Sequence, residues 1–352
     1  MARSPTVHTI RLVSMAMPLK SDLSLIMKQI GTDNINATMQ YIVLSAGHEW
    51  NFYCWKGAVE QTNNIRFIKD LLPRFLGRFW RKPFKNKLFI RLFWFPLIKH
   101  YLSISHQPTT LIVYDWGILT EYSYCIRKLR RLYPLLKIVY VFTNIIKITG
   151  ATTFGLLPTL KQDYDEVFAF DPEDAKKYGF KYSRLVYTAS LPANAPDTYE
   201  YDVFYVGQAK DRYAKLIEIY RRLRADGFRC LFYIFGVPEE KQYRDVGLIY
   251  NKRLHYSDVL DYMAKARCLV DVIQGDSAGL TIKTCEAVVL DKKLITTNFN
   301  VVNESFYKSN NILLYNSTSD LQKFMESEFV PYSESDKHVF SHEQLIKQIE
   351  AK

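Results

Sequence analysis

The chain has 352 residues, of which 48% are hydrophobic, and a formal net charge of +11. This length predicts two domains, and the absence of any run of 18 apolar residues excludes an ordinary membrane-spanning helix. The five cysteines show no Cys-x-x-Cys spacing, which argues against a disulfide framework or a zinc site and for a reduced, cytosolic protein. The start of the chain also lacks the apolar stretch and cleavage site of a secretory signal.

Residues 1–38 are polar and mixed, and the first clear strand is expected only at Tyr41–Ser45. This contrast predicts either that Met39 is the true start or that residues 1–38 form a loosely packed extension. The alternative is an ordinary N-terminal helix over Ser21–Ile30, where some helical periodicity is visible.

Strands and helices are then predicted to alternate up to about residue 190. After a loop at 48–50, the predicted strands are Leu111–Tyr114, Lys137–Phe142 and Glu166–Phe170, with a helix at Leu119–Tyr133. Asp171 followed by Pro172 is typical of a helix start, and Gly179 of its end. Strands separated by helices predict a parallel sheet with right-handed crossovers.

A second alternation follows residues 188–200, whose two prolines and small residues are typical of a linker. Its predicted strands are Asp202–Val206, Cys230–Phe235, Cys268–Ile273, Leu294–Thr296 and Ile312–Tyr315. Its predicted helices are Tyr213–Ala225 and Ser257–Ala266, the latter capped by Ser257. A last helix is predicted to begin near Ser341, with Gln344 completing a capping box. We therefore expect an α/β chain with Rossmann-like domains at 39–190 and 191–330, and a C-terminal tail and helix at 331–352.

The strongest functional signal lies at residues 270–298. An apolar strand leads into a turn with Gly275 and Gly279, and a short helix carrying Glu286 comes next. Glycines at such a junction let backbone N–H groups approach a phosphate, and a carboxylate in the helix can accept hydrogen bonds from ribose hydroxyls. The segment predicts the nucleotide half-site of a doubly wound sheet.

Residues 66–100 contain ten Lys or Arg and one acid, so they carry +9 of the net charge of +11. Phe and Trp residues are interleaved, which predicts a basic, aromatic helical segment that contacts an anionic membrane through Arg74, Arg78, Trp80, Arg81, Lys82 and Trp94. Each basic residue near such a surface contributes about 1 kcal/mol. The alternative is a core-packing helix pair with a solvated basic face. Nucleic acid is not expected as a partner, because no winged-helix, RNP or zinc signature accompanies the charge.

Four motifs carry a family resemblance: Tyr201–Gln208, Phe232–Gly236, Gly279–Ala287 and Lys292–Asn298. They resemble the C-terminal domain of GT-B glycosyltransferases, and more narrowly the bacterial enzymes of lipopolysaccharide and capsular polysaccharide biosynthesis. Segments 41–45 and 167–179 extend the likeness to the first half.

The resemblance implies a GT-B architecture of two Rossmann-like domains facing across a cleft. The implied activity is hexosyltransferase-like transfer from a nucleotide-sugar, bound by the C-terminal domain, to a lipid-linked oligosaccharide, bound by the N-terminal domain. No metal and no cofactor are implied. The enzyme would lie in the cytoplasm, peripherally on the inner face of the cytoplasmic membrane.

The resemblance also implies a set of donor-binding residues. These are Gly207, Gln208, Lys210, Arg212, Gly236, Gly279, Leu280, Thr281, Lys283 and Glu286. Retaining GT-B enzymes often place a further glutamate eight positions before the one that matches Glu286, but here that position is Ala278 and the nearest acid is Asp276. Whether the reaction retains or inverts configuration is therefore open.

The catalytic candidates follow the first strands of the N-terminal half. His48 and Glu49 come after the first strand and Asp115 after the next, at the edge where such sheets form their crevice, so each could deprotonate an acceptor hydroxyl. Asp163-Tyr-Asp165 matches a metal-binding pattern of another transferase class, but it lies in the half that would not bind the donor. The missing glutamate leaves a second function open, namely a nucleotide-sugar-binding or assembly subunit without turnover.

Overall fold

The structure, a computed structural model, describes residues 39–44, 49–68, 95–103, 107–114, 123–146, 157, 159–193, 198–275 and 277–351. His48, Asp115 and Asp276 lie outside these ranges, as do residues 1–38 and all six predicted membrane contacts. The predictions made for those residues stay predictions.

The first sheet has six parallel strands in the order β2-β1-β3-β4-β5-β6. The strands are β1 (Gln40–Leu44), β2 (Ile65–Ile68), β3 (Thr109–Tyr114), β4 (Lys137–Phe142), β5 (Glu166–Ala169) and β6 (Lys181–Tyr182). Alternate side chains of β1 face opposite ways, as a pleated strand requires. Val43 shares a buried cluster with Trp55 of α2 (Glu49–Gln61). Leu44 shares another with Ile98 of α5 (Phe95–Ser103) and Ile126 of α6 (Ser123–Leu132).

The second sheet also has six parallel strands, in the order β12-β11-β10-β7-β8-β9. The strands are β7 (Tyr201–Gln208), β8 (Cys230–Phe235), β9 (Leu248–Tyr250), β10 (Ala266–Asp271), β11 (Lys293–Thr296) and β12 (Ile312–Leu314). Numbered within this half and read from β9, the order is 3-2-1-4-5-6, that of a doubly wound nucleotide-binding sheet. Its topological switch point lies between β7 and β10.

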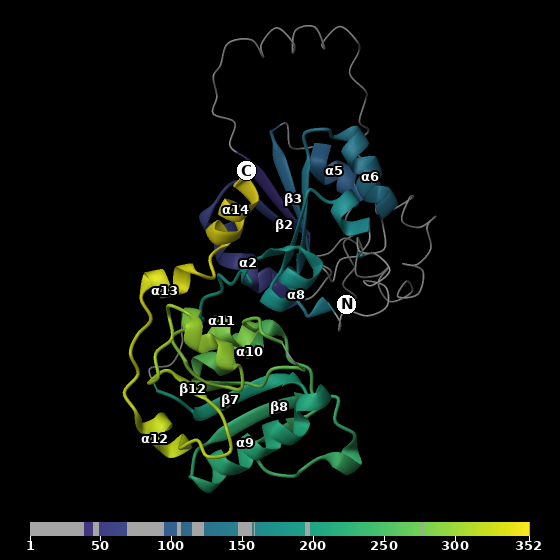
Figure 1. The fold of residues 1–352 in the computed structure, drawn as a ribbon. Coiled ribbons are helices and arrows are strands. Elements are labelled where there is room, and N and C mark those ends of the chain that lie inside the picture. Colours follow the sequence, from purple (N-terminus) through teal and green to yellow (C-terminus); the bar gives the residue numbers. More distant parts are fainter. Residues whose placement is uncertain are drawn as a thin grey trace, which may run out of the picture. The chain divides into compact units, whose positions relative to one another are not determined.

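Helices cover both faces of the second sheet (Figure 1). The helix α9 (Tyr213–Ala225) and the helix α12 (Leu321–Glu326) bury side chains with Tyr205 and Phe232 on one face. The helices α10 (Tyr256–Ala264) and α11 (Ile282–Val289) bury theirs with Phe204 and Tyr233 on the other. Burying both faces explains why these strands are continuous apolar runs rather than alternating ones.

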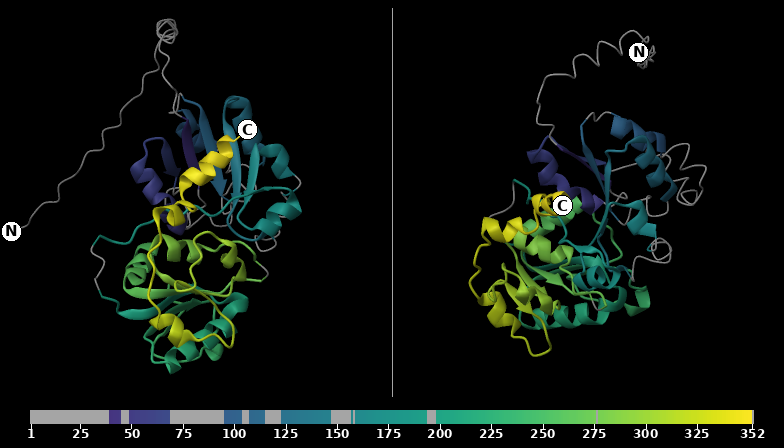
Figure 2. Two further views of the ribbon diagram at one scale, coloured as in Figure 1. Left: turned by 60° about the vertical axis from the view of Figure 1, so that its left-hand side comes forward. Right: turned by 45° about the horizontal axis from the view of Figure 1, so that its top comes forward.

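The C-terminal helices return to the first sheet. After α13 (Glu334–His338), the helix α14 (His342–Glu350) lies beside its strands in both views of Figure 2. The Tyr41 hydroxyl donates to Glu350, and the Lys137 ammonium donates to the Ile349 carbonyl. The helix α14 therefore stabilises the first sheet.

One buried apolar cluster is shared by the two sheets. It contains Val43 and Val139 of the first sheet, Phe204 and Leu269 of the second, and Tyr187 from the connection between them. We call the first sheet with α2, α5, α6 and α8 (Pro172–Tyr178) the N-terminal lobe, and the second sheet with α9–α12 the C-terminal lobe. The predicted α/β architecture, two parallel Rossmann-like sheets with flanking helices, is confirmed by this topology.

Several local predictions are confirmed. Asp171 caps α8, accepting from the N–H groups of Glu173 and Asp174, and Gly179 ends that helix with a φ of 63°. All five cysteines are buried and free.

Other local predictions are wrong. Glu49 and Trp50 begin the helix α2 instead of lying in a loop, and the start of the basic segment at 66–68 belongs to the strand β2 instead of a helix. The strand β10 lies two residues earlier than predicted. His255 rather than Ser257 caps α10, and Ser341 precedes α14 without the side-chain bond of a capping box.

Candidate functional site

A cavity of about 370 Å³ lies where the carboxyl ends of strands from both sheets come together. Among the described residues, the N-terminal lobe contributes Trp50, Thr143, Asn144, Ile145, Phe170 and Leu185, and the C-terminal lobe contributes Gln208, Lys210, Arg212, Gln274, Ser277, Thr281 and Ile282. On the C-terminal side these residues flank the switch point between β7 and β10, the place where open α/β sheets bind their ligands.

Two cations form part of the C-terminal wall. Lys210 and Arg212 lie in the short 3₁₀ helix η5 (Lys210–Arg212) directly after β7. The Lys210 ammonium donates to the Gln274 amide oxygen over 2.5 Å, and the Arg212 guanidinium donates to the carbonyls of Val272 (3.0 Å) and Gln208 (2.6 Å). Neither cation forms an ion pair with a carboxylate in the part of the chain that the structure describes.

The surroundings of Lys210 favour an anionic ligand. Burial, and then the neighbouring Arg212, lower the pKa of Lys210. Its backbone has a φ of 45°, a left-handed conformation that a lysine rarely adopts. Such outliers gather at ligand sites, and a bound anion would offset the desolvation of Lys210.

The turn at 277–279, between β10 and α11, is occupied by a carboxylate of the other lobe. One Asp171 oxygen accepts hydrogen bonds from the Ser277 hydroxyl (3.2 Å) and from the backbone N–H groups of Ala278 (2.7 Å) and Gly279 (2.9 Å). A Cβ at Gly279 would come within 2.6 Å of the Phe170 carbonyl oxygen, so this glycine permits a close approach to the N-terminal lobe. The turn was predicted to approach a phosphate, and here it approaches Phe170 and Asp171.

Glu286 lies at the centre of a buried polar network in α11. Its side chain is completely buried, and its two oxygens accept hydrogen bonds of 2.6 Å from the Tyr256 hydroxyl and the Lys283 ammonium. The Tyr256 hydroxyl is also 3.1 Å from that of Tyr187. Burial, and then the charge of Glu286, raise the pKa of Tyr256 and Tyr187 well above the usual value, so both hydroxyls keep their protons.

Glu49, a predicted catalytic base, joins the lobes at a second place. Its carboxylate accepts from the Tyr256 backbone N–H (3.2 Å) at the start of α10 and lies 3.3 Å from His255 Nδ1. A carboxylate at a helix N-terminus satisfies a free N–H group and interacts favourably with the helix dipole. The side chain remains 34% exposed, so it is still open to solvent.

The structure brings only some of the predicted donor-binding residues to the cavity. Gln208, Lys210, Arg212 and Thr281 line it, and Thr281 also caps α11 by accepting from the N–H groups of Lys283 and Thr284. Leu280 and Glu286 are buried, Gly207 lies within β7, and Gly236 follows β8 with a φ of 75°.

Sequence reasoning missed the contribution of Trp50, Phe170, Gln274 and Asp171. Gln274 follows a strand and could have been noticed on that ground. Asp171 could not, because its partners lie 106 to 108 positions further along the chain.

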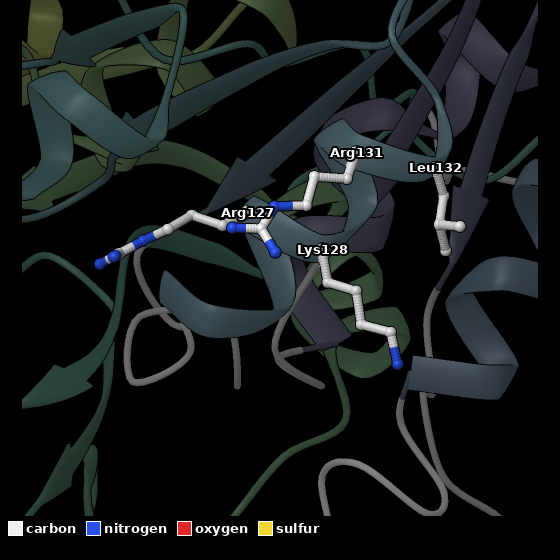
Figure 3. A pocket seen from close by; sticks show the side chains of 4 residues that line it. All are labelled: Arg127, Lys128, Arg131 and Leu132. Carbon is white, nitrogen blue, oxygen red and sulfur yellow. The ribbon is translucent and has the colours of Figure 1, made fainter.

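A basic hollow of about 470 Å³ lies on α6 of the N-terminal lobe (Figure 3). Its described lining consists of Arg127, Lys128, Arg131 and Leu132. Leu132 is 47% exposed and the nearby Leu135 is 85% exposed. The combination of cations and exposed apolar side chains suits an anionic, partly apolar surface.

Within the described ranges, no helix is long and apolar enough to cross a membrane, and no three metal-binding side chains are grouped. Asp163 and Asp165, which matched a metal-binding pattern, have structural partners. Asp163 pairs with Arg127 (3.0 Å), and Asp165 pairs with Arg130 (2.9 Å) and accepts from the Ile138 N–H (2.7 Å).

Comparisons with known proteins give structural likenesses only. No protein-family model and no curated protein sequence matches the chain. A trehalose-6-phosphate protein from E. coli bound with UDP-2-fluoro glucose is similar at 11% identity and a TM-score of 0.44, over 89% of this chain and 95% of that one. A UDP-GlcNAc 2-epimerase from Neisseria meningitidis bound to UDP-GlcNAc is similar at 10% identity and a TM-score of 0.43, over 82% and 89%.

A glycosylation-associated protein complex from Streptococcus agalactiae is similar at 10% identity and a TM-score of 0.38. The match covers 74% of this chain and 55% of that one, so the chain spans about half the length of that protein. At 10–11% identity and TM-scores below 0.5, these likenesses assign no activity and no ligand to this chain.

Proposed function

We propose that the protein is a glycosyltransferase that takes its sugar from a nucleoside diphosphate donor. The observation that carries this proposal is the pair Lys210 and Arg212, which lines the cavity at the switch point and hydrogen-bonds to carbonyl and amide oxygens, with no carboxylate close enough for an ion pair among the described residues. Two cations there can bind a diphosphate and stabilise the negative charge that develops on it as it departs.

The chemistry requires few groups. The acceptor hydroxyl oxygen would form a bond to the anomeric carbon while the bond from that carbon to the diphosphate oxygen breaks, and the electron pair would leave with the diphosphate. A base would take the hydroxyl proton. Glu49 is the described candidate, because its carboxylate is partly exposed and Trp50, next to it, lines the cavity. His48 and Asp115 remain candidates from the sequence.

Glu286 can support donor binding indirectly. Its ion pair holds Lys283 in the first turn of α11, next to Thr281 and Ile282 of the cavity wall. A direct contact between Glu286 and a ribose would require a carboxylate oxygen to give up Tyr256 or Lys283. The predicted ribose contact therefore remains a proposal that depends on a rearrangement of this network.

The acceptor and the location are proposed from charge. We propose a lipid-linked oligosaccharide acceptor, as in lipopolysaccharide or capsule biosynthesis, and a peripheral position on the inner face of the cytoplasmic membrane. The basic hollow on α6 with the exposed Leu132 and Leu135 supports an anionic membrane surface as a partner. The predicted contacts at 74–94 would add to it.

A second candidate function is a nucleotide-sugar-binding or assembly subunit without turnover. The position of Asp171 favours it, since this carboxylate occupies the N–H groups of the turn that the family resemblance assigns to the donor.

Both candidates can be tested on the purified protein. A panel of nucleotide-sugars is screened by thermal shift. Each nucleotide-sugar that raises the melting temperature of the protein is then tested as a donor for sugar transfer or slow hydrolysis. The transferase predicts binding together with release of the nucleoside diphosphate. Binding without release would support the assembly subunit, and no binding of any donor would contradict both.

A further inference from the structure

Both oxygens of the Asp171 carboxylate accept hydrogen bonds at the junction of the two lobes. One oxygen accepts the three hydrogen bonds from Ser277, Ala278 and Gly279, and the other accepts from the N–H groups of Glu173 (3.0 Å) and Asp174 (3.1 Å). The residue is 2% exposed. Five donors therefore converge on one buried negative charge.

This arrangement matters for the cavity, because Ser277 and Phe170 belong to its wall. Successive backbone N–H groups on a turn are donors that can bind a phosphoryl oxygen. A carboxylate oxygen and a phosphoryl oxygen are both anionic acceptors, so they cannot use the same two N–H groups at once. The charge of Asp171 also repels an anion in a region of low dielectric constant.

We propose that Asp171 is an internal competitor of phosphoryl groups at the 277–279 turn. Diphosphate binding at Lys210 and Arg212 would reach its full strength only when the turn leaves Asp171. The proposal rests on the proposed function, since it describes the regulation of the same site.

The rest of the junction limits the movement that this release requires. The shared apolar cluster contains side chains of both lobes, and Glu49 holds the start of α10 through a separate contact. Releasing the turn breaks three hydrogen bonds to one oxygen and leaves those other contacts in place. The competition is therefore a local change at the turn and does not require the lobes to separate.

Two substitutions remove the competitor and keep the helix cap. In Asp171→Ser the hydroxyl can still cap α8 but is too short to satisfy the turn as well. In Asp171→Asn the single carbonyl oxygen can serve only one of the two donor groups, and the amide nitrogen then faces the other. Asp211→Asn is the matched control, because Asp211 accepts from the Gly275 N–H (3.0 Å) near the same cavity but is exposed.

The test is calorimetric titration of each protein with inorganic pyrophosphate. We expect Asp171→Ser to bind at least about tenfold more tightly than the wild type, and Asp211→Asn to change affinity by less than about threefold. A folded Asp171→Ser protein that binds equally or more weakly would overturn the proposal. So would an equal gain in Asp211→Asn, which would show a general effect of charge.

Folding of the variants is checked first by circular dichroism. If Asp171→Ser does not fold, Asp171→Asn is held to the same criterion. If neither folds in buffer, recovery of the folded protein on addition of pyrophosphate supports the competition, and no recovery contradicts it.

A parallel titration with UDP and GDP separates this inference from the proposed function. Tight pyrophosphate binding by Asp171→Ser without binding of either nucleotide would leave the competition standing and contradict the proposed function. If the wild type binds a nucleotide and Asp171→Ser binds it no more tightly, the proposed function stands and the competition is contradicted.

Discussion

The Glu286 carboxylate accepts a 2.6 Å hydrogen bond from the Tyr256 hydroxyl, which joins α11 to α10 in the buried core of the C-terminal lobe. Its other oxygen holds the Lys283 ammonium at 2.6 Å. Because the carboxylate has no exposed surface, its charge is balanced entirely by neighbours inside the protein. Glu286 therefore stabilises the packing of α11, the helix whose first residues line the candidate site.

Glu286→Gln should destabilise the protein by about 3 kcal/mol, because it leaves the charge of the mostly buried Lys283 without its partner. The double variant Glu286→Gln, Lys283→Met should recover much of that loss, since it removes the unpaired charge as well. Urea unfolding measures both values. A single variant as stable as the wild type would show that this ion pair does not support the fold.

Glu49→Gln should keep donor affinity and lose turnover by about 100- to 10,000-fold if Glu49 is the acceptor base. Glutamine can still accept the hydrogen bond from the Tyr256 N–H, so the cap of α10 is preserved. Steady-state kinetics with a transferable donor, together with donor binding by calorimetry, separates the two effects. Normal turnover in this variant would move the role to His48 or Asp115.

Two neighbouring buried lysines give the stability of the protein a pH dependence. Burial lowers the pKa of Lys292 to about 8, and burial followed by Arg267 lowers that of Lys293 to about 8. Between this pH and about 10.5, the unfolded chain holds more protons on these groups than the folded one does. Each lysine therefore adds to the free energy of unfolding as pH rises through that window.

Lys292→Met tests this dependence. Lys292 is 3% exposed and makes one hydrogen bond, of 3.3 Å, to the Ala264 carbonyl, so methionine fills its space at little cost. The variant should be more stable than the wild type at pH 7, and its advantage should shrink by about 1 kcal/mol per pH unit between pH 8 and 10. Urea unfolding at several pH values measures this, and a constant difference would contradict the lowered pKa.

Vesicle binding tests the membrane proposal. The protein should sediment with vesicles containing anionic lipid and be released as salt rises, because exposed charges are screened beyond roughly 8 Å at physiological ionic strength. Replacing Arg74, Arg78, Arg81 and Lys82 by Gln should release it, whereas replacing Trp80 and Trp94 by Ser should weaken binding even at low salt.

Lys241→Gln with Arg244→Gln removes exposed charge from the C-terminal lobe and is the control, which should bind as the wild type does. Equal sedimentation with neutral vesicles, or no sedimentation with either kind, would contradict the membrane proposal and favour a packing role for residues 66–100.

The sequence predicts the fold well where strands are long and buried on both faces. The apolar runs 138–142 and 230–235 predict the strands Lys137–Phe142 and Cys230–Phe235 to the residue. The strands β2 and β9 have four and three residues, too few for a periodic signal. The helix α2 was missed because aromatic residues and Gly57 obscure its periodicity.

The candidate site was only partly predictable. Lys210 and Arg212 follow a strand of the C-terminal lobe directly, so their place at the carboxyl edge could be inferred. The partners of Asp171 and Glu49 could not, since these contacts join helices and turns of different lobes and leave no local pattern. The turn at 277–279 is an example: the sequence predicts that its N–H groups bind a phosphate, whereas in the structure those of Ala278 and Gly279 donate to Asp171.

Calorimetric binding of UDP and GDP, by the wild type and by the double variant Lys210→Gln, Arg212→Gln, tests most directly whether this cavity binds a nucleoside diphosphate. Each cation should contribute one or more charge-assisted hydrogen bonds of roughly 1.5–3 kcal/mol, so the double variant should bind at least about a hundredfold more weakly while remaining folded. Lys215→Gln, on the neighbouring helix and paired with Glu218, is the control and should bind as the wild type does. Nucleotide affinity that survives the loss of both cations, or no measurable affinity in the wild type, would contradict the assignment of this cavity to a nucleoside diphosphate donor.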